Sequence, residues 1–336
     1  MKYKTVFIIP YFGSLPRQMP LFLKSCLYNP DFTWIIFTDD KSYRQYNIPK
    51  NVSFIDFSFK QFNDLLKLKF GNDVSIASPY KLCDLKPMYG YIFEDYILQY
   101  DYWGHTDLDV VFGKISDFIS DEILEKYDKL FCLGHFIMYR NTFDNNRLFM
   151  SLYKGSYIYK HVLDNPDICW FDEEWKDEKN INQIFLENRK NVLQIDYSLN
   201  FSDKYNSFRR VVYCGHNNPK SDDHGYYLEN NAHEIYFWSK GLLFSLSACN
   251  EKIVKKEYMY MHFMHRNMKI PLNIKAIENF LIVPNSFVPI KEIPESVNEL
   301  KRVHFNRFNI DMTVRKYKLW IQDLPSKIHR KVSRLF

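Results

Sequence analysis

The sequence predicts an α/β protein with an at least partly parallel sheet, because apolar, β-branched runs alternate with stretches of helical spacing. The run Lys4–Pro10 is apolar on both faces, as the strands of a buried parallel sheet are, Thr33–Phe37 is a second buried strand, and Val52–Phe57 is a short third. Met19–Tyr28, between the first two runs, has the spacing of an amphipathic helix. Such sheets bind ligands at the carboxyl ends of their strands, so the residues after each run are the first candidates for a site.

The composition is that of an ordinary globular protein. Of the 336 residues, 46% are hydrophobic and 25% are charged, which suits one large domain or two small ones. The six cysteines lie far apart, so reduced thiols in a cytoplasmic protein fit better than a disulfide framework or a structural zinc site. A short apolar run near the N-terminus, and no apolar run of about 18 residues anywhere, predict a soluble or peripheral protein without a signal peptide.

Positive charge is concentrated at the C-terminal end. From Lys301 onward, ten lysines and arginines accompany two aspartates, a local charge of +8 that leaves −3 of the total +5 for the other 300 residues. Apolar residues alternate with these basic residues from Val314 onward, across Pro325. We therefore expect a basic helical extension over 296–336. It can lie on an anionic membrane surface or dock on the body with its charges outward, and the sequence leaves both open.

The stretch with the most chemical information is Tyr100–Gly113, which contains Asp107 and Asp109. We expect Tyr102–Phe112 to form one strand, in which the two-residue period would point both carboxylates to the same side. Two close carboxylates repel each other unless a cation lies between them, and hard divalent ions prefer oxygen ligands. The pair indicates a metal site that holds a phosphorylated substrate, with a polar strand end as the alternative.

Other acidic residues follow the second strand. Asp39 and Asp40 come directly after it, where such sheets commonly contact a base or ribose, and a simple turn is the alternative. The glycine-rich fingerprints of dinucleotide and P-loop sites are absent from the sequence.

A helix is predicted to begin at Ser78, with Pro79 in its first turn. Lys81 and Asp84 lie on its free side, and Pro87 should kink it, which leaves the direction of Lys86 open. The two lysines can neutralise a diphosphate while Asp84 binds a hydroxyl. The alternative is a solvated face with an ordinary i,i+3 ion pair. The predicted apolar stripe consists of Leu82, Leu85, Tyr89, Ile92, Phe93 and Tyr96.

Two segments carry further candidates. In the strand-like run Leu130–Tyr139, Gly134 indicates close approach of a ligand or of another backbone segment. In Cys169–Trp175, Asp172 and Glu173 lie between aromatic residues, where acids tend to have a raised pKa or to bind sugar hydroxyls. The alternative is that Asp172 caps a helix. Near the end of the body, His262 and Arg266 follow a tyrosine- and methionine-rich strand, and a lone histidine there is typical of a core residue.

Taken in order, these elements resemble the GT-A fold of nucleotide-sugar glycosyltransferases, and most closely the bacterial enzymes that build capsular and other surface polysaccharides. The resemblance rests on the first strand with Pro10 and Tyr11, the Lys81–Pro87 helix, Asp107–Asp109 and Tyr260–Arg266. It implies a Rossmann-like mixed sheet flanked by helices. The expected organisation is a GT-A domain over 1–295, with a nucleotide-binding half of about 1–115 and an acceptor half of about 116–295, followed by the basic extension 296–336.

The resemblance also implies roles for individual residues. The implied ligands of a divalent ion, Mn²⁺ or Mg²⁺, are Asp107, Asp109 and His262. The residues implied to bind the donor or its nucleotide are Pro10, Tyr11, Asp39, Lys81, Asp84, Lys86, Asp107 and Arg266. Asp172 and Glu173 would face the acceptor, and they are the candidates for a catalytic base. Where this family often has a lysine just before the arginine, His265 stands here.

The predicted function is therefore the metal-dependent transfer of a sugar from a nucleotide diphosphate donor, a UDP-sugar, to a bacterial cell-surface glycan. The distant histidine ligand favours retention of configuration. The predicted partners are the donor, a glycan or lipid-linked oligosaccharide acceptor and an anionic membrane surface, with no nucleic acid, and the predicted location is the cytoplasm at the inner membrane face. The alternatives are a metal-dependent phosphodiesterase or nucleotidyltransferase, and a non-enzymatic glycan-binding protein with a tyrosine-rich surface.

Overall fold

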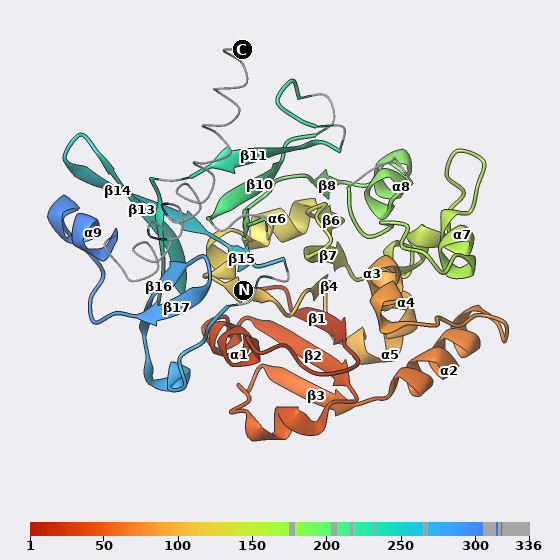
Figure 1. Cartoon of the computed structure of the whole chain (residues 1–336). Helices are drawn as coiled ribbons and strands as arrows, with labels where there is room; N and C mark the ends of the chain where they lie inside the picture. The colour runs from red at the N-terminus through yellow and green to blue at the C-terminus, as the bar shows by residue number, and fades with distance from the viewer. Residues whose placement is uncertain are drawn as a thin grey trace, which may run out of the picture.

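The computed structural model describes residues 1–174, 179–202, 207–215, 218–222, 224–231, 233–264, 266, 268–304, 314 and 317. Its main feature is a seven-stranded mixed sheet with the strand order β3-β2-β1-β4-β7-β6-β8 (Figure 1). The fold is therefore α/β and compatible with a Rossmann-like arrangement. The strands of this sheet are β1 Thr5–Pro10, β2 Phe32–Thr38, β3 Val52–Asp56, β4 Tyr102–Thr106, β6 Lys129–Leu130, β7 Phe136–Arg140 and β8 Val192–Leu193.

The first three predicted strands are confirmed. β1 pairs in parallel with both β2 and β4, and β2 pairs in parallel with β3. β7 then runs antiparallel to β4 and to β6, while β6 and β8 are parallel. The carboxyl ends of β1, β2 and β4 consequently meet at one edge of the sheet, where ligands of such sheets bind.

Helices cover both faces of the main sheet. Along β1 the side chains alternate, so that Val6 and Ile8 join one apolar layer while Phe7 and Ile9 join the other. The second layer includes residues of α1 and α6, and the first includes residues of α2, α4, α7 and α8. The helices are α1 Met19–Leu27, α2 Phe59–Phe70, α3 Leu82–Leu85, α4 Tyr89–Ile92, α5 Glu94–Ile97, α6 Asp121–Lys126, α7 Ile158–Asp164, α8 Ile181–Glu187 and α9 Val297–His304.

Three smaller sheets complete the described chain. The orders are β5-β15-β9, β10-β11 and β14-β13-β12-β16-β17. Their strands are β5 Val110–Phe112, β9 Ser198–Asn200, β10 Arg209–Tyr213, β11 Tyr226–Asn230, β12 Ile235–Ser239, β13 Leu242–Cys249, β14 Lys252–Tyr258, β15 Tyr260–His262, β16 Asn279–Val283 and β17 Ser286–Pro289. The three-stranded sheet matters most for the site, because it begins where the chain leaves β4.

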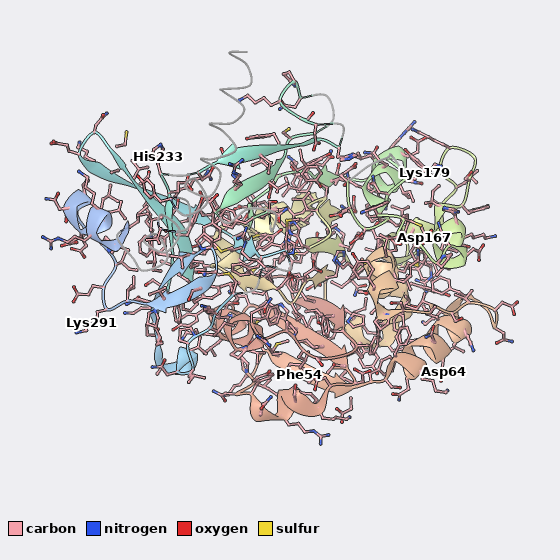
Figure 2. All side chains as sticks on the ribbon, in the orientation of Figure 1. Phe54, Asp64, Asp167, Lys179, His233 and Lys291 are labelled. Carbon is pink, nitrogen blue, oxygen red and sulfur yellow. The ribbon has the colours of Figure 1, made fainter. Side chains whose placement is uncertain are left out.

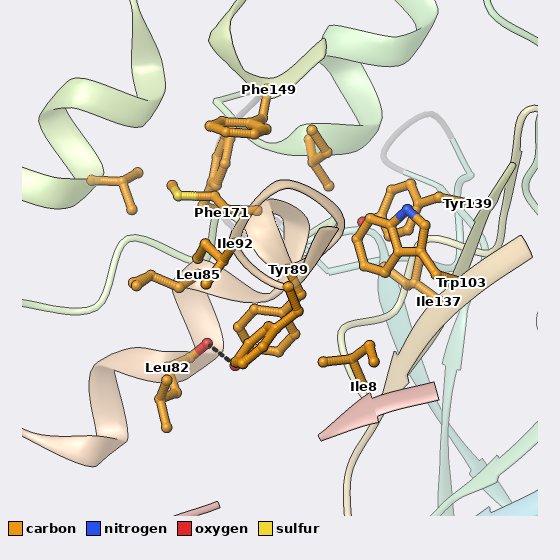
Figure 3. Close-up of a cluster of buried hydrophobic side chains, with 14 of the residues drawn as sticks. Ile8, Leu82, Leu85, Tyr89, Ile92, Trp103, Ile137, Tyr139, Phe149 and Phe171 are labelled. Carbon is orange, nitrogen blue, oxygen red and sulfur yellow. Dashed lines mark hydrogen bonds between the residues drawn. The ribbon is translucent and has the colours of Figure 1, made fainter. Parts of the chain in front are cut away.

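The helix predicted after Ser78 is present but interrupted. The Ser78 hydroxyl accepts a hydrogen bond from the Tyr80 amide (3.3 Å), and a 3-10 turn, Pro79–Lys81, leads into α3. At Pro87 the helix breaks into the 3-10 turn Lys86–Met88 and then α4, because proline has no amide hydrogen for the helical ladder. The predicted apolar stripe packs in the core, with the Tyr89 hydroxyl bonded to the Leu82 carbonyl (Figure 3). Tyr96, the last residue of the predicted stripe, is the exception, because it is 40% exposed.

Several predicted elements are wrong. Tyr102–Phe112 is not one strand, since β4 ends at Thr106 and β5 pairs with β15 in a different sheet. Leu130–Tyr139 is divided between β6 and β7. The polar stretch Asn141–Lys160, whose composition favours a helix throughout, instead contains the 3-10 turn Asn145–Met150 and the start of α7. Each prediction followed local spacing, and in each case pairing with or packing on distant residues overrides it.

Two segments whose prolines and polar residues favour loops contain strands. Part of Asn217–Asn231 forms β11, and part of Asn285–Val297 forms β17. The predicted basic extension begins with α9, but most of it lies outside the described residues, as does its membrane-facing stripe apart from Val314 and Tyr317. Within the described chain, every helix is too short or too polar to cross a lipid bilayer.

Candidate functional site

The turn Asp107–Asp109 lies at the carboxyl end of β4, between the main sheet and the three-stranded sheet. The Asp107 amide donates to the His135 carbonyl at 3.1 Å, which fixes the turn to the start of β7. After it, β5 pairs antiparallel with β15, so that Val110 faces His262 across the ladder. The register therefore brings the two aspartates next to a histidine about 150 residues later in the chain, although the turn is not the strand that we expected.

Asp107, Asp109 and His262 form a cluster with metal-binding geometry. One ligand atom from each residue lies within 4.8 Å of the others. His262 Nε2 is 3.4 Å from Asp109 Oδ1 and 3.7 Å from Asp107 Oδ2. The three residues could hold a divalent ion after a small inward movement, because adjacent ligands of such an ion lie about 3 Å apart, and they would leave its other positions open to further ligands. Two carboxylates and one imidazole suit Mn²⁺ or Mg²⁺ better than zinc, which favours more nitrogen or sulfur ligands.

The surroundings of His262 orient it as a ligand. Its Nδ1 is 3.0 Å from the side-chain oxygen of Asn200, which can only accept, so Nδ1 donates there and Nε2 is the nitrogen that faces the carboxylates. Asn200 is held opposite His262 because β9 pairs in parallel with β15. Burial alone would lower the pKa of His262, but the carboxylates of Asp109 and Asp107 outweigh it and raise that pKa. The cluster thus favours positive charge at its centre.

A second histidine supports the first from behind. The ring of His135 stacks on that of His262, with centroids 4.4 Å apart, and its Nδ1 lies 2.7 Å from the Tyr260 hydroxyl. Burial, followed by the nearby charges of His262 and Lys86, lowers the pKa of His135 well below its usual value. Burial thus favours the neutral form of His135, which packs against the face of the His262 ring. Asn200 and Tyr260 were not among the sequence-predicted site residues, because their roles depend on strand pairing that leaves no local signal.

Lys86 connects the aspartate cluster to the predicted acceptor side. Its ammonium donates to Asp107 Oδ1 (2.8 Å) and to the Gly134 carbonyl (2.9 Å), and it lies 3.3 Å from Asp172 Oδ2. Burial would lower the pKa of Lys86, but Asp107 and Asp172 hold it well above its usual range. The break at Pro87 sets this direction, which the sequence left open. Lys86 is therefore a fixed positive charge between two carboxylates.

Asp172 and Glu173 lie beside the same lysine. Asp172 is only 4% exposed, and burial raises its pKa to about 8, with repulsion from Glu173 adding to the effect and Lys86 opposing it. Burial also raises the pKa of Glu173, whose carboxylate accepts from the Gly134 amide at 3.2 Å. The alternative in which Asp172 caps a helix is wrong, because Asn180 caps α8.

Gly134 explains how Asp172 comes so close. A Cβ atom at position 134 would lie 2.4 Å from Asp172 Oδ2 and 3.2 Å from Glu173 Oε2. A close approach at Gly134 is therefore present, but the approaching groups are the side-chain carboxylates of Asp172 and Glu173 rather than a ligand or a second backbone segment.

The raised pKa of Asp172 gives a testable pH dependence of stability. Between the unfolded pKa of about 4 and the folded value of about 8, the folded state retains a proton that the unfolded state has lost. The free energy of unfolding must then fall as pH rises through this window. In Asp172→Asn this contribution is missing. We expect urea unfolding in EDTA to show the wild type losing stability relative to the variant from pH 5 to pH 8. Parallel pH profiles would contradict the assignment.

Lys81 and Asp84 are paired as predicted, but the pair is buried rather than solvated. Lys81 is 4% exposed and Asp84 is 0% exposed, and the ammonium lies 2.8 Å from Asp84 Oδ2. Lys81 also donates to the carbonyl of Asp167, which lies beside α7 (Figure 2). The Asp84 carboxylate accepts from the amides of Cys169 (2.8 Å) and Phe171 (3.1 Å). These contacts hold the segment that leads into Asp172. Direct contact with a donor stays a prediction.

The predicted nucleotide contacts lie around the ends of β1 and β2. Pro10 is buried at the end of β1. Burial and then the carboxylates of Asp109 and Asp40 raise the pKa of Tyr11, which puts its hydroxyl within electrostatic reach of the aspartate cluster. Asp39 accepts from the Gly13 amide (2.8 Å), and Asp40 caps the 3-10 turn Lys41–Gln45. The predicted turn is thus present, and the ribose contact of Asp39 stays a prediction.

Arg266 follows β15 and is fixed by backbone oxygens. Its guanidinium donates to the carbonyls of Ser202 and Pro284, and it lies over the ring of Phe208. Its predicted contact with a diphosphate stays a prediction. His265, which stands where a lysine was expected from the resemblance, lies outside the described residues.

The fold and the site together define an α/β protein with a candidate divalent-metal centre at the carboxyl edge of its main sheet. The chain belongs to the DUF6625 family, a family of unknown function, whose model matches residues 7–291. That range contains every candidate site residue described above. No curated protein matches the chain.

Proposed function

We propose that this protein is a metal-dependent glycosyltransferase of the GT-A type, which transfers a sugar from a nucleotide diphosphate donor, a UDP-sugar, to a bacterial cell-surface glycan. The observation that carries the proposal is the convergence of Asp107, Asp109 and His262 at the carboxyl edge of a parallel-stranded region. Lys86 and the buried acid Asp172 lie directly beside this cluster. A cation site and a fixed lysine suit the negative charge that develops in sugar–phosphate cleavage, and an acid of raised pKa suits proton transfer in an inverting reaction.

The chemistry explains why these groups belong together. When the bond between the anomeric carbon and the phosphate oxygen breaks, negative charge develops on the departing diphosphate. A divalent ion held by Asp107, Asp109 and His262 would stabilise that charge where it develops. Lys86 keeps Asp107 and Asp172 at fixed positions on either side of its ammonium group. In this proposal the lysine orients both the cation site and the acceptor side.

Asp172 is the residue suited to move a proton. An inverting transfer needs a base for the acceptor hydroxyl, and a carboxylate with a pKa of about 8 is well matched to that task near neutral pH. A retaining transfer, which the sequence favours, can instead leave the proton to the departing phosphate. The configuration of the anomeric carbon in the product, read by NMR, distinguishes these routes.

The experiment that tests the proposal combines ligand binding with turnover. We expect UDP or a UDP-sugar to raise the melting temperature of the full chain only when Mn²⁺ or Mg²⁺ is present, and slow hydrolysis of one donor from a panel to require the same ion. Stabilisation by free glycan alone would instead support a glycan-binding protein. Metal-dependent cleavage of phosphodiesters without sugar transfer would support the phosphodiesterase alternative.

The place of action is part of the proposal. An acceptor carried on a membrane lipid fits the basic C-terminal segment, whose charge of +8 would attract an anionic cytoplasmic membrane surface. Sedimentation with vesicles of anionic and neutral lipid, with and without residues 305–336, tests this part separately from catalysis.

A further inference from the structure

Trp170 has a strained backbone and an exposed side chain next to the candidate site. Its φ angle is +51°, a left-handed conformation that is rare for a bulky residue. Its side chain is nevertheless 39% exposed, so burial of the indole in the core does not explain why the strained backbone is kept. Strained residues of this kind persist only where the surroundings impose them, and they cluster at functional sites.

The surroundings that impose this conformation are the residues on either side. The Asp84 carboxylate binds both flanking amides, that of Cys169 at 2.8 Å and that of Phe171 at 3.1 Å. Phe171 is fully buried in the apolar cluster under α4 (Figure 3). Because the chain is fixed before and after it, Trp170 is directed outward, two residues before Asp172.

A second exposed aromatic residue, Tyr80, lies in the turn that packs against this segment. Tyr80 is 66% exposed and comes one turn before Asp84. The next residue, Lys81, donates to the Asp84 carboxylate and to the Asp167 carbonyl, so the turn that carries Tyr80 contacts the segment that leads to Asp172. Partial burial and then the charges of Cys83, Asp172, Asp84 and Glu173 raise the pKa of Tyr80, in agreement with this placement.

We propose that Trp170 and Tyr80 form an aromatic platform that binds a pyranose ring of the acceptor glycan beside Asp172. The inference rests on the proposed function and names a subsite within it. A pyranose has an apolar face of C–H groups that packs on an aromatic ring, and hydroxyls at its edge that bind carboxylates. Exposed rings offer the first surface, and the adjacent acids offer the second. A tryptophan kept only for packing would be expected to lie in the core rather than on this surface.

The test compares glycan binding with nucleotide binding in the same variants. Saturation-transfer NMR with methyl β-D-glucopyranoside and methyl β-D-galactopyranoside measures binding to the full chain, and the melting-temperature shift with UDP and Mn²⁺ measures the donor side. We expect Trp170→Ala and Tyr80→Ala to weaken glycoside binding at least about tenfold, and Trp170→Phe to keep part of it. The nucleotide shift should be unchanged in all three.

A matched control is Phe143→Ala. Phe143 is 69% exposed but follows Arg140, which pairs with Tyr102 at the start of β4 and so lies at the opposite edge of the sheet from Asp107. It should leave glycoside binding unchanged. Undiminished binding in Trp170→Ala, with the nucleotide shift intact, would overturn the platform. Loss of binding in Trp170→Ala without any nucleotide shift in the wild type would support the platform and reject the transferase.

Discussion

Replacing Asp109 with asparagine is expected to abolish metal binding and sugar transfer while leaving the fold intact. The substitution removes one of the two anionic ligands of the cluster and leaves the amide oxygen as a much weaker one. Isothermal titration with Mn²⁺ should show a loss of affinity of at least about 100-fold. Donor turnover should fall by a similar or larger factor if the proposed function is correct.

The stability of this variant separates a lost ligand from a damaged fold. Asp107 and Asp109 repel each other without a cation, so Asp109→Asn should unfold at the same temperature as the wild type in EDTA, or slightly higher. The difference should appear only when Mn²⁺ is added, because the ion then stabilises the wild type alone. Asp117→Asn changes an exposed carboxylate nearby in the sequence, 3.0 Å from Lys114, and should bind Mn²⁺ as the wild type does. Equal Mn²⁺ affinity in Asp109→Asn would reject the metal site.

The sequence was most informative where structure is decided locally. β1 and β2 are almost entirely apolar runs, and the break at Pro87 follows from proline chemistry alone. The same reasoning failed at Asp107–Asp109, because the alternation of aspartate and leucine is compatible with a continuing strand. What ends the strand is the pairing of β5 with β15, which comes from a distant part of the chain.

In the candidate site, too, some features were predictable from the sequence and others depend on contacts between distant parts of the chain. The residue types and order predicted Asp107, Asp109 and His262 as one group, and the structure brings them together. Asn200 could not be predicted, since its role depends on the register between β9 and β15. The side to which Lys86 points follows from the way in which the broken helix packs, and local spacing does not contain that information.

Lys81 and Asp84 show that helical spacing alone does not reveal whether a charged face is buried. On the helix they occupy the face that the apolar stripe leaves free, so spacing alone indicates solvent. The segment Asp167–Phe171 covers that face and contributes a carbonyl and two amides to the pair. Burial of a charged face by a distant segment cannot be read from the helix itself, and it converts an ordinary ion pair into one with a large expected effect on stability.

Replacing Asp84 with alanine is therefore expected to destabilise the fold by about 3–5 kcal/mol, because the substitution leaves the Lys81 ammonium buried without a counter-charge and two backbone amides without an acceptor. Lys81→Met should cost less, since it removes the buried charge and keeps the bonds from Asp84 to the amides. Urea unfolding of both single variants and the double variant gives the coupling energy between the two side chains.

The exposed pair Lys60–Asp64 supplies the comparison, because its side chains are 83% and 51% exposed at a similar separation of 2.6 Å. Asp64→Ala should change the free energy of unfolding by no more than about 0.5 kcal/mol. If Asp84→Ala cost no more than Asp64→Ala, the pair would not be holding the segment before Asp172. A large cost in Asp84→Ala, together with loss of the pH dependence assigned to Asp172, would show that the pair does hold this segment. The reason is that Asp172 keeps its raised pKa only while the segment buries it.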